Sequence, residues 1–326
     1  MRCMISIVSA PSGPVAYRRT PVVSWLRLAC ILLLLTTLTG CAWLSAKQSE
    51  LALRPTAVKP ANLPVDSELF RPGDESWLVP VPATRMPRAD AAPPGEMDQL
   101  SLWWLPAAQP DAPALLYLHG TFRNLYRNLP KIQAIRDAGF SVLAVDYRGW
   151  GRSTVIVPDE ETIAADARVA WAELQRRQPQ ASRRVIFGHS MGGAVAVRLA
   201  STQRWQQDYG ALVVESSFSR MPEVAAEAGF WGRVAARLTT LEFDAIGRID
   251  QVDAPVLVLH GSADTTVPIV LGRRLCTAAK AAQPAPGRVT CIEFAGGTHS
   301  RLHTEFKAVY TQTFNDLAQA LPVTPP

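Results

Sequence analysis

Short apolar runs alternate regularly with helical stretches from residue 114 onward, and this alternation constrains the fold more than any other feature. The strand-like runs are Ala114–Leu118, Ser141–Val145, Arg184–Phe187, Ala211–Val214, Pro255–Leu259 and Val289–Phe294. Helical patterning lies between them at Leu129–Ala138, Glu161–Arg177 and Gly192–Ser201. Strands that are apolar throughout are buried on both faces, so the pattern predicts a mostly parallel α/β sheet with helices on both sides.

Composition is that of an ordinary globular protein. The 326 residues are 48% hydrophobic and 19% charged, which suits one large domain with an N-terminal extension. The formal net charge of +5 comes from scattered arginines, without a dense basic stripe beside aromatic residues. Nucleic acid is therefore not an expected partner.

The first 41 residues have the features of an export signal. Arg27 and earlier arginines precede a short apolar run, Leu28–Leu38, which is too short to span a bilayer comfortably. The run ends in Leu38-Thr39-Gly40-Cys41, which resembles the lipobox of bacterial lipoproteins. That resemblance implies a signal peptide at residues 1–40 and a lipid on Cys41 that attaches the chain to a membrane. A plain signal peptide or a short anchor helix is the alternative.

The resemblance also implies a location. A lipid-anchored chain would lie in the bacterial cell envelope and face the periplasm, and Ala42 after the cysteine resembles the pattern retained for outer-membrane sorting. Residues 41–66 carry Pro55, Pro60 and Pro64 with little apolar periodicity, so we expect a tether there and the catalytic domain at residues 67–326. The segment Pro87–Pro94 is expected to be a loop between early antiparallel strands.

Two of the five cysteines, Cys276 and Cys291, are predicted to lie on a helix and on the strand that follows it. In an oxidising periplasm they could form a disulfide. Two buried free thiols fit the sequence equally well, because the distance between their Cα atoms is not given by the spacing.

The segment Gly188-His189-Ser190-Met191-Gly192 lies between a predicted strand and a predicted helix. A nucleophile elbow requires this context, because the serine sits on a tight strand-to-helix turn and the glycines leave space for neighbouring backbone. Ser190 is therefore the predicted nucleophile. A bare motif of this kind is weak, and its placement is what makes it informative.

A serine nucleophile needs a base, and the base needs an orienting acid. Asp264 and His299 each follow a predicted strand at its carboxyl end, so both side chains are expected to converge on Ser190. Glu215 is the alternative acid. His303 is the alternative base, although a solvated position on the next helix is the more common outcome for such a histidine.

The remaining candidates have structural or supporting roles. His119, His189 and His260 are expected to be structural, and Asp146 to hold a loop. Acyl transfer also needs donors for an oxyanion, for which we predict the backbone N–H groups of Met191 and Thr121. Those residues come from the nucleophile turn and from the loop after Ala114–Leu118.

Five ordered segments resemble the α/β-hydrolase superfamily, near its serine aminopeptidase-like group. They are Leu118-His119-Gly120, Asp146–Ser153, Gly188–Gly193, His260–Pro268 and Gly297-Thr298-His299. The resemblance implies an eight-stranded, mostly parallel sheet, a Ser-Asp-His triad, and neither a metal nor an organic cofactor. About forty residues between Glu215 and Val256 leave room only for a small lid or none. We therefore expect an open site bordered by Phe230 and Trp231, which either pack in the core or contact substrate.

The predicted activity is hydrolysis of a carboxylic ester or thioester through an acyl-enzyme. A serine peptidase or aminopeptidase acting on short peptides is the alternative, because the same residues can cleave amides. An envelope lipoprotein that binds ligands without turnover belongs to a different class, and a degraded site would be expected to lack a member of the triad. The sequence leaves the oligomeric state open.

Overall fold

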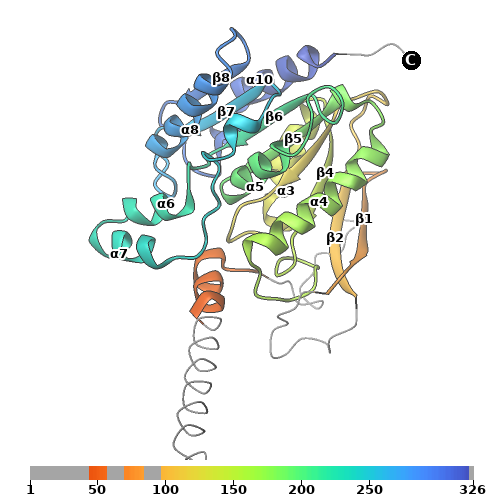
Figure 1. The fold of residues 1–326 in the computed structure, drawn as a ribbon. Helices are drawn as coiled ribbons and strands as arrows, with labels where there is room; N and C mark the ends of the chain where they lie inside the picture. The colour runs from red at the N-terminus through yellow and green to blue at the C-terminus, as the bar shows by residue number, and fades with distance from the viewer. Residues whose placement is uncertain (1–43, 57–69, 84–96, 323–326) are drawn as a thin grey trace, which may run out of the picture. The chain divides into compact units, whose positions relative to one another are not determined.

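The computed structural model describes residues 44–56, 70–83 and 97–322 (Figure 1). These residues belong almost entirely to the unit Ser45–Pro326, which is separate from the unit Met1–Leu44. The expected signal peptide, Cys41 and the loop Pro87–Pro94 lie outside the described residues.

Eight strands form one sheet among the described residues, in the order β1-β2-β4-β3-β5-β6-β7-β8. Strand β2 is antiparallel to both of its neighbours, and every pairing from β4 to β8 is parallel. The strands are β1 (Glu75–Val81), β2 (Asp98–Leu105), β3 (Ala114–Leu118), β4 (Ser141–Asp146), β5 (Arg184–His189), β6 (Ala211–Glu215), β7 (Val256–Gly261) and β8 (Val289–Phe294). The predicted eight-stranded, mostly parallel α/β-hydrolase sheet is confirmed.

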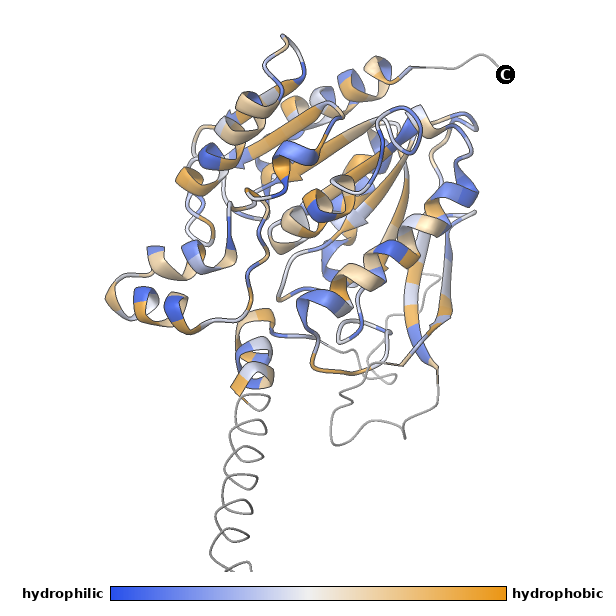
Figure 2. Ribbon diagram, viewed as in Figure 1, coloured by the Kyte–Doolittle hydropathy of each residue, from blue (hydrophilic) through white to orange (hydrophobic). Residues whose placement is uncertain are grey.

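Helices cover both faces of this sheet, and Figure 2 shows hydrophobic residues concentrated along the central strands. One core cluster includes side chains of α4, α5 and α8, and the other includes side chains of α3 and α10. The helices are α3 (Leu125–Asp137), α4 (Glu160–Arg177), α5 (Met191–Ala200), α6 (Met221–Glu227), α7 (Phe230–Leu238), α8 (Ile269–Ala282), α9 (Leu302–Glu305) and α10 (Lys307–Ala320), with 3-10 turns η2 (Ala181–Arg183) and η3 (Ile249–Gln251). The central strands β3 to β6 are buried along their whole length, as their apolar sequences predict.

The register of the sheet aligns the loops that matter for function. Leu118 pairs with Gly188 at the ends of β3 and β5, and His189 pairs with Glu215 at the ends of β5 and β6. Because carboxyl ends of parallel strands meet at one edge, the loops after β3, β5, β6, β7 and β8 gather there. That edge carries the residues predicted for catalysis and for the oxyanion hole.

The segment after β6 forms two short helices, α6 and α7, which Figure 1 shows as a hairpin extending from the body. None of the residues in either helix is buried. The sequence left room for a small lid or none, and the segment forms this hairpin instead of a large helical lid. Phe230 and Trp231 are exposed, so of the two roles that the sequence left open, packing in the core is excluded.

Residues 44–53, which the sequence analysis places in a tether, form a helix instead. Leu53 at its end is fully buried in the core, and the Thr56 carbonyl accepts a hydrogen bond from Gly151 N–H. The three prolines that suggested a tether all follow this helix, so they do not interrupt it. This part of the chain is packed on the domain, and residues 57–66 lie outside the described ranges.

Cys276 on α8 and Cys291 on β8 form a disulfide, with Cα atoms 6.4 Å apart. The sequence left this pairing open against two free thiols. The parallel strands β7 and β8 explain the proximity, because α8 crosses between them and packs beside β8.

Candidate active site

Ser190 is the single residue between the end of β5 and the start of α5. Its backbone has φ 57° and ψ −124°, a conformation that L-residues rarely adopt. The turn is this tight because backbone lies against backbone: a Cβ placed on Gly192 would be 2.0 Å from the carbonyl oxygen of Leu118. Sterically, only glycine fits at position 192, two residues after the serine.

Two hydrogen bonds, one with the last residue of β6 and one with the loop after it, hold the turn. The Ser190 N–H donates to the Glu215 carbonyl oxygen at 2.9 Å, and the Ser217 hydroxyl donates to the Ser190 carbonyl oxygen at 2.7 Å. Both partners are buried, so the backbone of Ser190 is fixed on two sides.

The side chains of Ser190, His299 and Asp264 form one hydrogen-bonded row. His299 Nε2 lies 3.0 Å from Ser190 Oγ, and His299 Nδ1 lies 2.7 Å from Asp264 Oδ2. Each residue follows a different strand, β5, β8 and β7, at the shared carboxyl edge. The structure thus brings together all three residues predicted from the sequence.

Asp264 is held in place by its own loop. Its Oδ1 accepts hydrogen bonds from the N–H groups of Thr266 and Val267 at 2.9 and 2.8 Å. Burial alone would raise the pKa of this carboxyl, but the hydrogen bonds from His260 and His299 outweigh it and hold the pKa below its usual value. Asp264 therefore carries a negative charge toward His299 at neutral pH.

The loop after β3 approaches Ser190 closely. A Cβ on Gly120 would lie 2.8 Å from Ser190 Cβ and 3.3 Å from its Oγ, so only glycine fits against the serine. Thr121 follows directly, and Met191 is the first residue of α5. The backbone amides predicted to bind an oxyanion thus come from the two segments that flank the Ser190 hydroxyl.

Glu215, the alternative acid, forms other contacts. Its carboxylate pairs with the buried ammonium of Lys131 and accepts a hydrogen bond from the Tyr310 hydroxyl at 2.8 Å. Neither carboxylate oxygen is bonded to His299. Glu215 therefore contributes a buried ionic contact beneath the site and positions Ser190 through its backbone.

His303, the alternative base, lies on α9 and is buried, which corrects the expectation of a solvated histidine. Its ring lies 6.2 Å from that of Tyr310, and its Nδ1 has no hydrogen-bond partner among the described residues. Burial lowers its pKa to about 4, and Lys131 acts in the same direction. His299, not His303, contacts Ser190.

The other histidines and Asp146 take supporting positions. His189 Nε2 lies 2.9 Å from the His299 carbonyl oxygen and thereby holds the loop that bears His299. Burial lowers the pKa of His119 to about 4, and its Nδ1 lies 2.6 Å from the Gly120 carbonyl oxygen. Asp146 accepts a hydrogen bond from Leu125 N–H at the start of α3.

Known proteins resemble this chain in sequence and in fold. Residues 109–246 match the model of a family described as serine aminopeptidase, S33. An uncharacterised protein of Mycobacterium tuberculosis is 37% identical over 183 residues, which cover 56% of this chain and 63% of that protein. Lysophosphatidylserine lipase ABHD12 of Danio rerio is 30% identical over 191 residues, covering 53% of this chain and 49% of the lipase.

Among solved structures, the esterase Pf2001 of Pyrococcus furiosus superposes with a TM-score of 0.60. The superposition covers 82% of this chain and 97% of the esterase at 17% identity, so this likeness shows the fold. The chain has the α/β-hydrolase fold. This α/β-hydrolase spans less than two thirds of the length of the two curated relatives named above.

Sequence analysis missed a group of side chains that pack next to Ser190, His299 and Asp264. In this α/β-hydrolase, the Ser217 hydroxyl bonds the backbone of Ser190. The side chain of Glu215 is bonded by Lys131 and Tyr310. Lys131 is the one with a local signal, since a lysine interrupts the apolar pattern of α3. His260 also lies 3.3 Å from Asp264, four residues along the chain.

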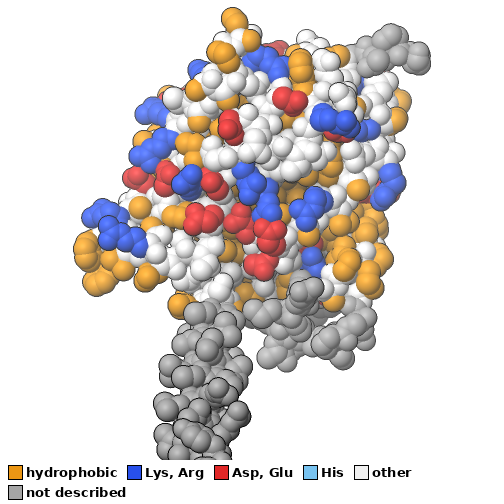
Figure 3. All heavy atoms as spheres, viewed as in Figure 1, with side chains coloured by type: hydrophobic (Ala, Val, Ile, Leu, Met, Phe, Trp, Pro, Cys, Tyr) orange, Lys and Arg blue, Asp and Glu red, His pale blue; other side chains and the backbone are white. Residues whose placement is uncertain are grey.

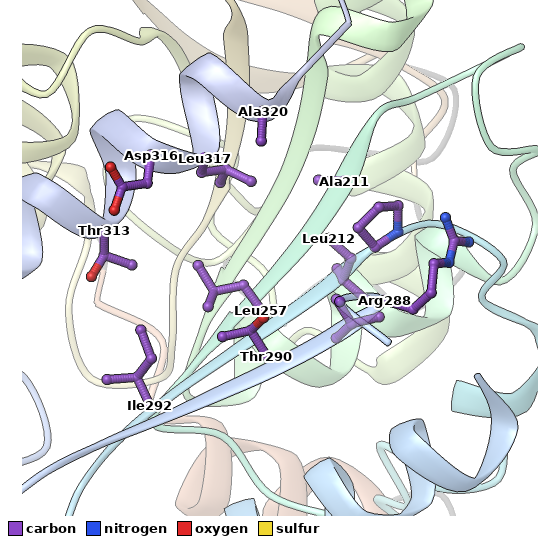
Figure 4. A pocket seen from close by; sticks show the side chains of 13 residues that line it. Ala211, Leu212, Leu257, Arg288, Thr290, Ile292, Thr313, Asp316, Leu317 and Ala320 are labelled. Atoms are coloured by element: carbon purple, nitrogen blue, oxygen red, sulfur yellow. The ribbon is translucent and has the colours of Figure 1, made fainter. Parts of the chain in front are cut away.

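A pocket of about 290 Å³ lies far from these residues, at the amino ends of the strands (Figure 4). Leu212, Leu257 and Ile292 line it from the sheet, and Thr313 and Leu317 from α10. No predicted site residue borders it. Within residues 44–56, 70–83 and 97–322, no His, Cys, Asp and Glu side chains group as metal ligands do, and no helix is long and apolar enough to cross a membrane.

Proposed function

We propose that this α/β-hydrolase cleaves carboxylic ester or thioester bonds, with Ser190 as nucleophile. The observation that supports this most directly is the row Ser190–His299–Asp264, whose two hydrogen bonds measure 3.0 and 2.7 Å. A serine, a base within hydrogen-bond reach and a carboxylate behind the base are the three parts that covalent acyl transfer requires.

The geometry assigns each side chain a step. His299 Nε2 removes the Ser190 hydroxyl proton as Oγ attacks the substrate carbonyl carbon, and then gives that proton to the departing alcohol or thiol. Asp264 accepts a hydrogen bond from Nδ1–H, which fixes the tautomer and stabilises the imidazolium. In the second half, water loses a proton to His299 and attacks the acyl-enzyme carbonyl. The bond to Ser190 Oγ breaks, His299 returns the proton to that oxygen, and the carboxylic acid leaves.

Negative charge that develops on the carbonyl oxygen needs donors already in place. We assign the backbone N–H groups of Thr121 and Met191 to this role. Gly120 supports the assignment because its lack of a side chain lets the loop after β3 lie against Ser190. Both amides are then fixed by folding and need no reorganisation during the reaction.

The proposed substrate is an ester or thioester of small to medium acyl length. Two similar proteins are named as a lysophosphatidylserine lipase and as an esterase, and both names describe ester hydrolysis. One observation favours a second candidate: the family model matched by residues 109–246 is named for a serine aminopeptidase. Cleavage of short peptides is therefore the alternative, and it uses the same residues.

The proposed location is the bacterial envelope, with the chain lipid-anchored at Cys41, facing the periplasm and sorted to the outer membrane. The lipobox-like segment before Cys41 supports this, and so does the disulfide Cys276–Cys291, because disulfides persist in oxidising compartments. The anchor is tested by metabolic labelling with radioactive palmitate. Cys41→Ser should lose the label that wild type carries, and retained labelling would contradict the anchor.

The activity is tested with p-nitrophenyl esters from acetate to palmitate and with p-nitroanilides of short peptides. The full chain in detergent is the appropriate sample, because Leu53 is part of the core and a truncation at the expected domain start would remove it. Ser190→Ala and His299→Ala should each lower kcat by at least about 10⁴-fold. His303→Gln is the matched control and should retain activity.

The outcomes separate the candidates. Turnover of esters alone supports the proposal, and turnover of peptides alone supports the aminopeptidase alternative. Retained ester hydrolysis in Ser190→Ala would overturn the assignment of the nucleophile. No turnover of either substrate class, together with no labelling of Ser190 by a fluorophosphonate, would favour a non-catalytic binding protein.

A further inference from the structure

Helix α7 exposes an unusual concentration of large apolar side chains. Trp231 is 78% exposed, Leu238 66% and Phe230 64%, and Val234 is also exposed. Figure 3 shows hydrophobic side chains gathered at the outer end of the α6–α7 hairpin, on the left of the view. Single exposed apolar residues are ordinary, but a contiguous group on one helix marks an interaction surface.

The four side chains share one side of the helix. At about 100° per residue, Phe230, Val234, Leu238 and Trp231 fall within an arc of about 100°. Arg233 and Arg237 border this arc on one side, and neither guanidinium forms an ion pair within the described residues. An amphipathic helix with aromatic residues on one face and arginines beside them has the pattern of helices that lie in a membrane interface.

The helix at residues 44–53 is bonded to the end of α7. Gln48 Nε2 donates to the Leu238 carbonyl oxygen at 2.7 Å, and Thr240 N–H donates to Gln48 Oε1 at 3.2 Å. Leu51 lies three residues after Gln48, on the same side of its helix, and is exposed. The apolar surface of α7 therefore continues onto the segment that connects the domain to its N-terminal part.

That connection is short. Three residues separate Cys41 from Ser45, and four Cα–Cα steps reach at most about 14 Å. A lipid on Cys41 would thus hold the bonded pair of helices at a membrane surface. The arginines of α7 complement the negative charge of anionic headgroups.

We propose that α7, together with Leu51, is a second contact between this α/β-hydrolase and a phospholipid bilayer with anionic headgroups. Trp231 and Phe230 insert at the boundary of headgroups and acyl chains, and Arg233 and Arg237 bind headgroup phosphates. The inference does not depend on the proposed reaction. It does give the site an orientation, because α6 begins six residues after Glu215, at the strand edge that carries Ser190.

The test is depth-dependent quenching of tryptophan fluorescence in the full chain. The protein is reconstituted in vesicles of phosphatidylglycerol and phosphatidylcholine, with and without bromine on the acyl chains, and the vesicle-bound fraction is isolated by flotation. The difference between wild type and Trp231→Phe isolates the signal of Trp231. Trp205→Phe is the matched control, because its ring lies under the Arg288 guanidinium, away from α7.

We expect bromine to reduce the Trp231 signal by about half or more and to leave the Trp205 signal unchanged. Replacement of both arginines, Arg233→Gln with Arg237→Gln, should weaken the quenching of Trp231. Three results overturn the proposal. The first is that Trp231 is quenched by aqueous iodide and not by bromine. The second is that another protein or a second copy shields Trp231 from both quenchers. The third is that the chain does not float with the vesicles.

Discussion

The ammonium of Lys131 and the carboxylate of Glu215 form an ion pair buried directly behind the Ser190 turn. Their side chains are 3% and 0% exposed, and the Tyr310 hydroxyl completes the contact. Burial lowers the pKa of Lys131, while Glu215 acts in the opposite direction. The pair joins α3 to β6, the strand whose last carbonyl holds the Ser190 backbone.

Glu215→Gln should destabilise the protein by about 3–5 kcal/mol, because it leaves the Lys131 charge buried without its partner. Urea unfolding followed by circular dichroism measures the change. The double variant Lys131→Met with Glu215→Gln should be more stable than Glu215→Gln alone, since no uncompensated charge remains. Equal stability of the two variants would show that Lys131 is not charged in the folded state.

Asp264→Asn should lower kcat by about 10⁴-fold with little loss of stability. The amide oxygen can still accept hydrogen bonds from Thr266 and Val267, so the loop keeps its shape. The amide nitrogen faces His299 Nδ1, however, and favours the tautomer in which Nε2–H points at Ser190. Steady-state kinetics and thermal unfolding are measured on the same sample; a large drop in Tm would mean that Asp264 acts through structure instead.

Stability should depend on pH through His303. Its pKa is about 4 in the folded protein against 6.5 for a free histidine, so the unfolded chain binds a proton at higher pH than the folded protein does. The stabilising effect of neutral His303 is therefore complete above pH 6.5 and is lost as pH falls toward about 4. Between these values, wild type should lose stability more steeply than His303→Gln in urea unfolding.

The comparison with the variant is necessary because other groups titrate in the same range. His119 shifts in the same direction, and Asp146, whose pKa burial raises to about 7, shifts in the opposite one. Parallel stability curves for wild type and His303→Gln would mean that His303 binds protons equally in both states.

The disulfide Cys276–Cys291 closes a short loop, with a sequence separation of 15 residues. Removing it through Cys276→Ala with Cys291→Ala should cost about 3 kcal/mol. Urea unfolding of wild type with and without dithiothreitol provides the matched measurement, and dithiothreitol should not affect the double variant. Reactive thiols at both positions in the untreated native protein would contradict the pairing.

The fold and the proximity of Ser190, His299 and Asp264 could be predicted because both follow from local patterns placed in order. Each apolar run became a strand, and α/β topology carries the residues after Phe187, Leu259 and Phe294 to one edge. Helix boundaries were less accurate. Helix α3 starts at Leu125, four residues before the predicted Leu129, because Asn124 caps it.

Features that depend on distant parts of the chain were not predictable in this way. The contact between Lys131 and Glu215 joins residues 84 positions apart, and nothing local to either indicates the other. The helix at 44–53 was missed because the prolines after it dominated the interpretation of that segment. The exposure of Trp231 also depends on where the hairpin lies on the domain, which its own sequence leaves open.

The backbone of Ser190 has a consequence for binding. A residue with φ 57° costs about 1–3 kcal/mol, and in this protein the packing of β3, β6 and α5 around the turn opposes relaxation. The hydroxyl is thus preorganised, and a substrate that docks beside it need not restrict a mobile side chain. Little conformational entropy therefore remains to be lost at the proposed nucleophile when the complex forms. The affinity for substrate is then set by the other protein surfaces that the substrate contacts.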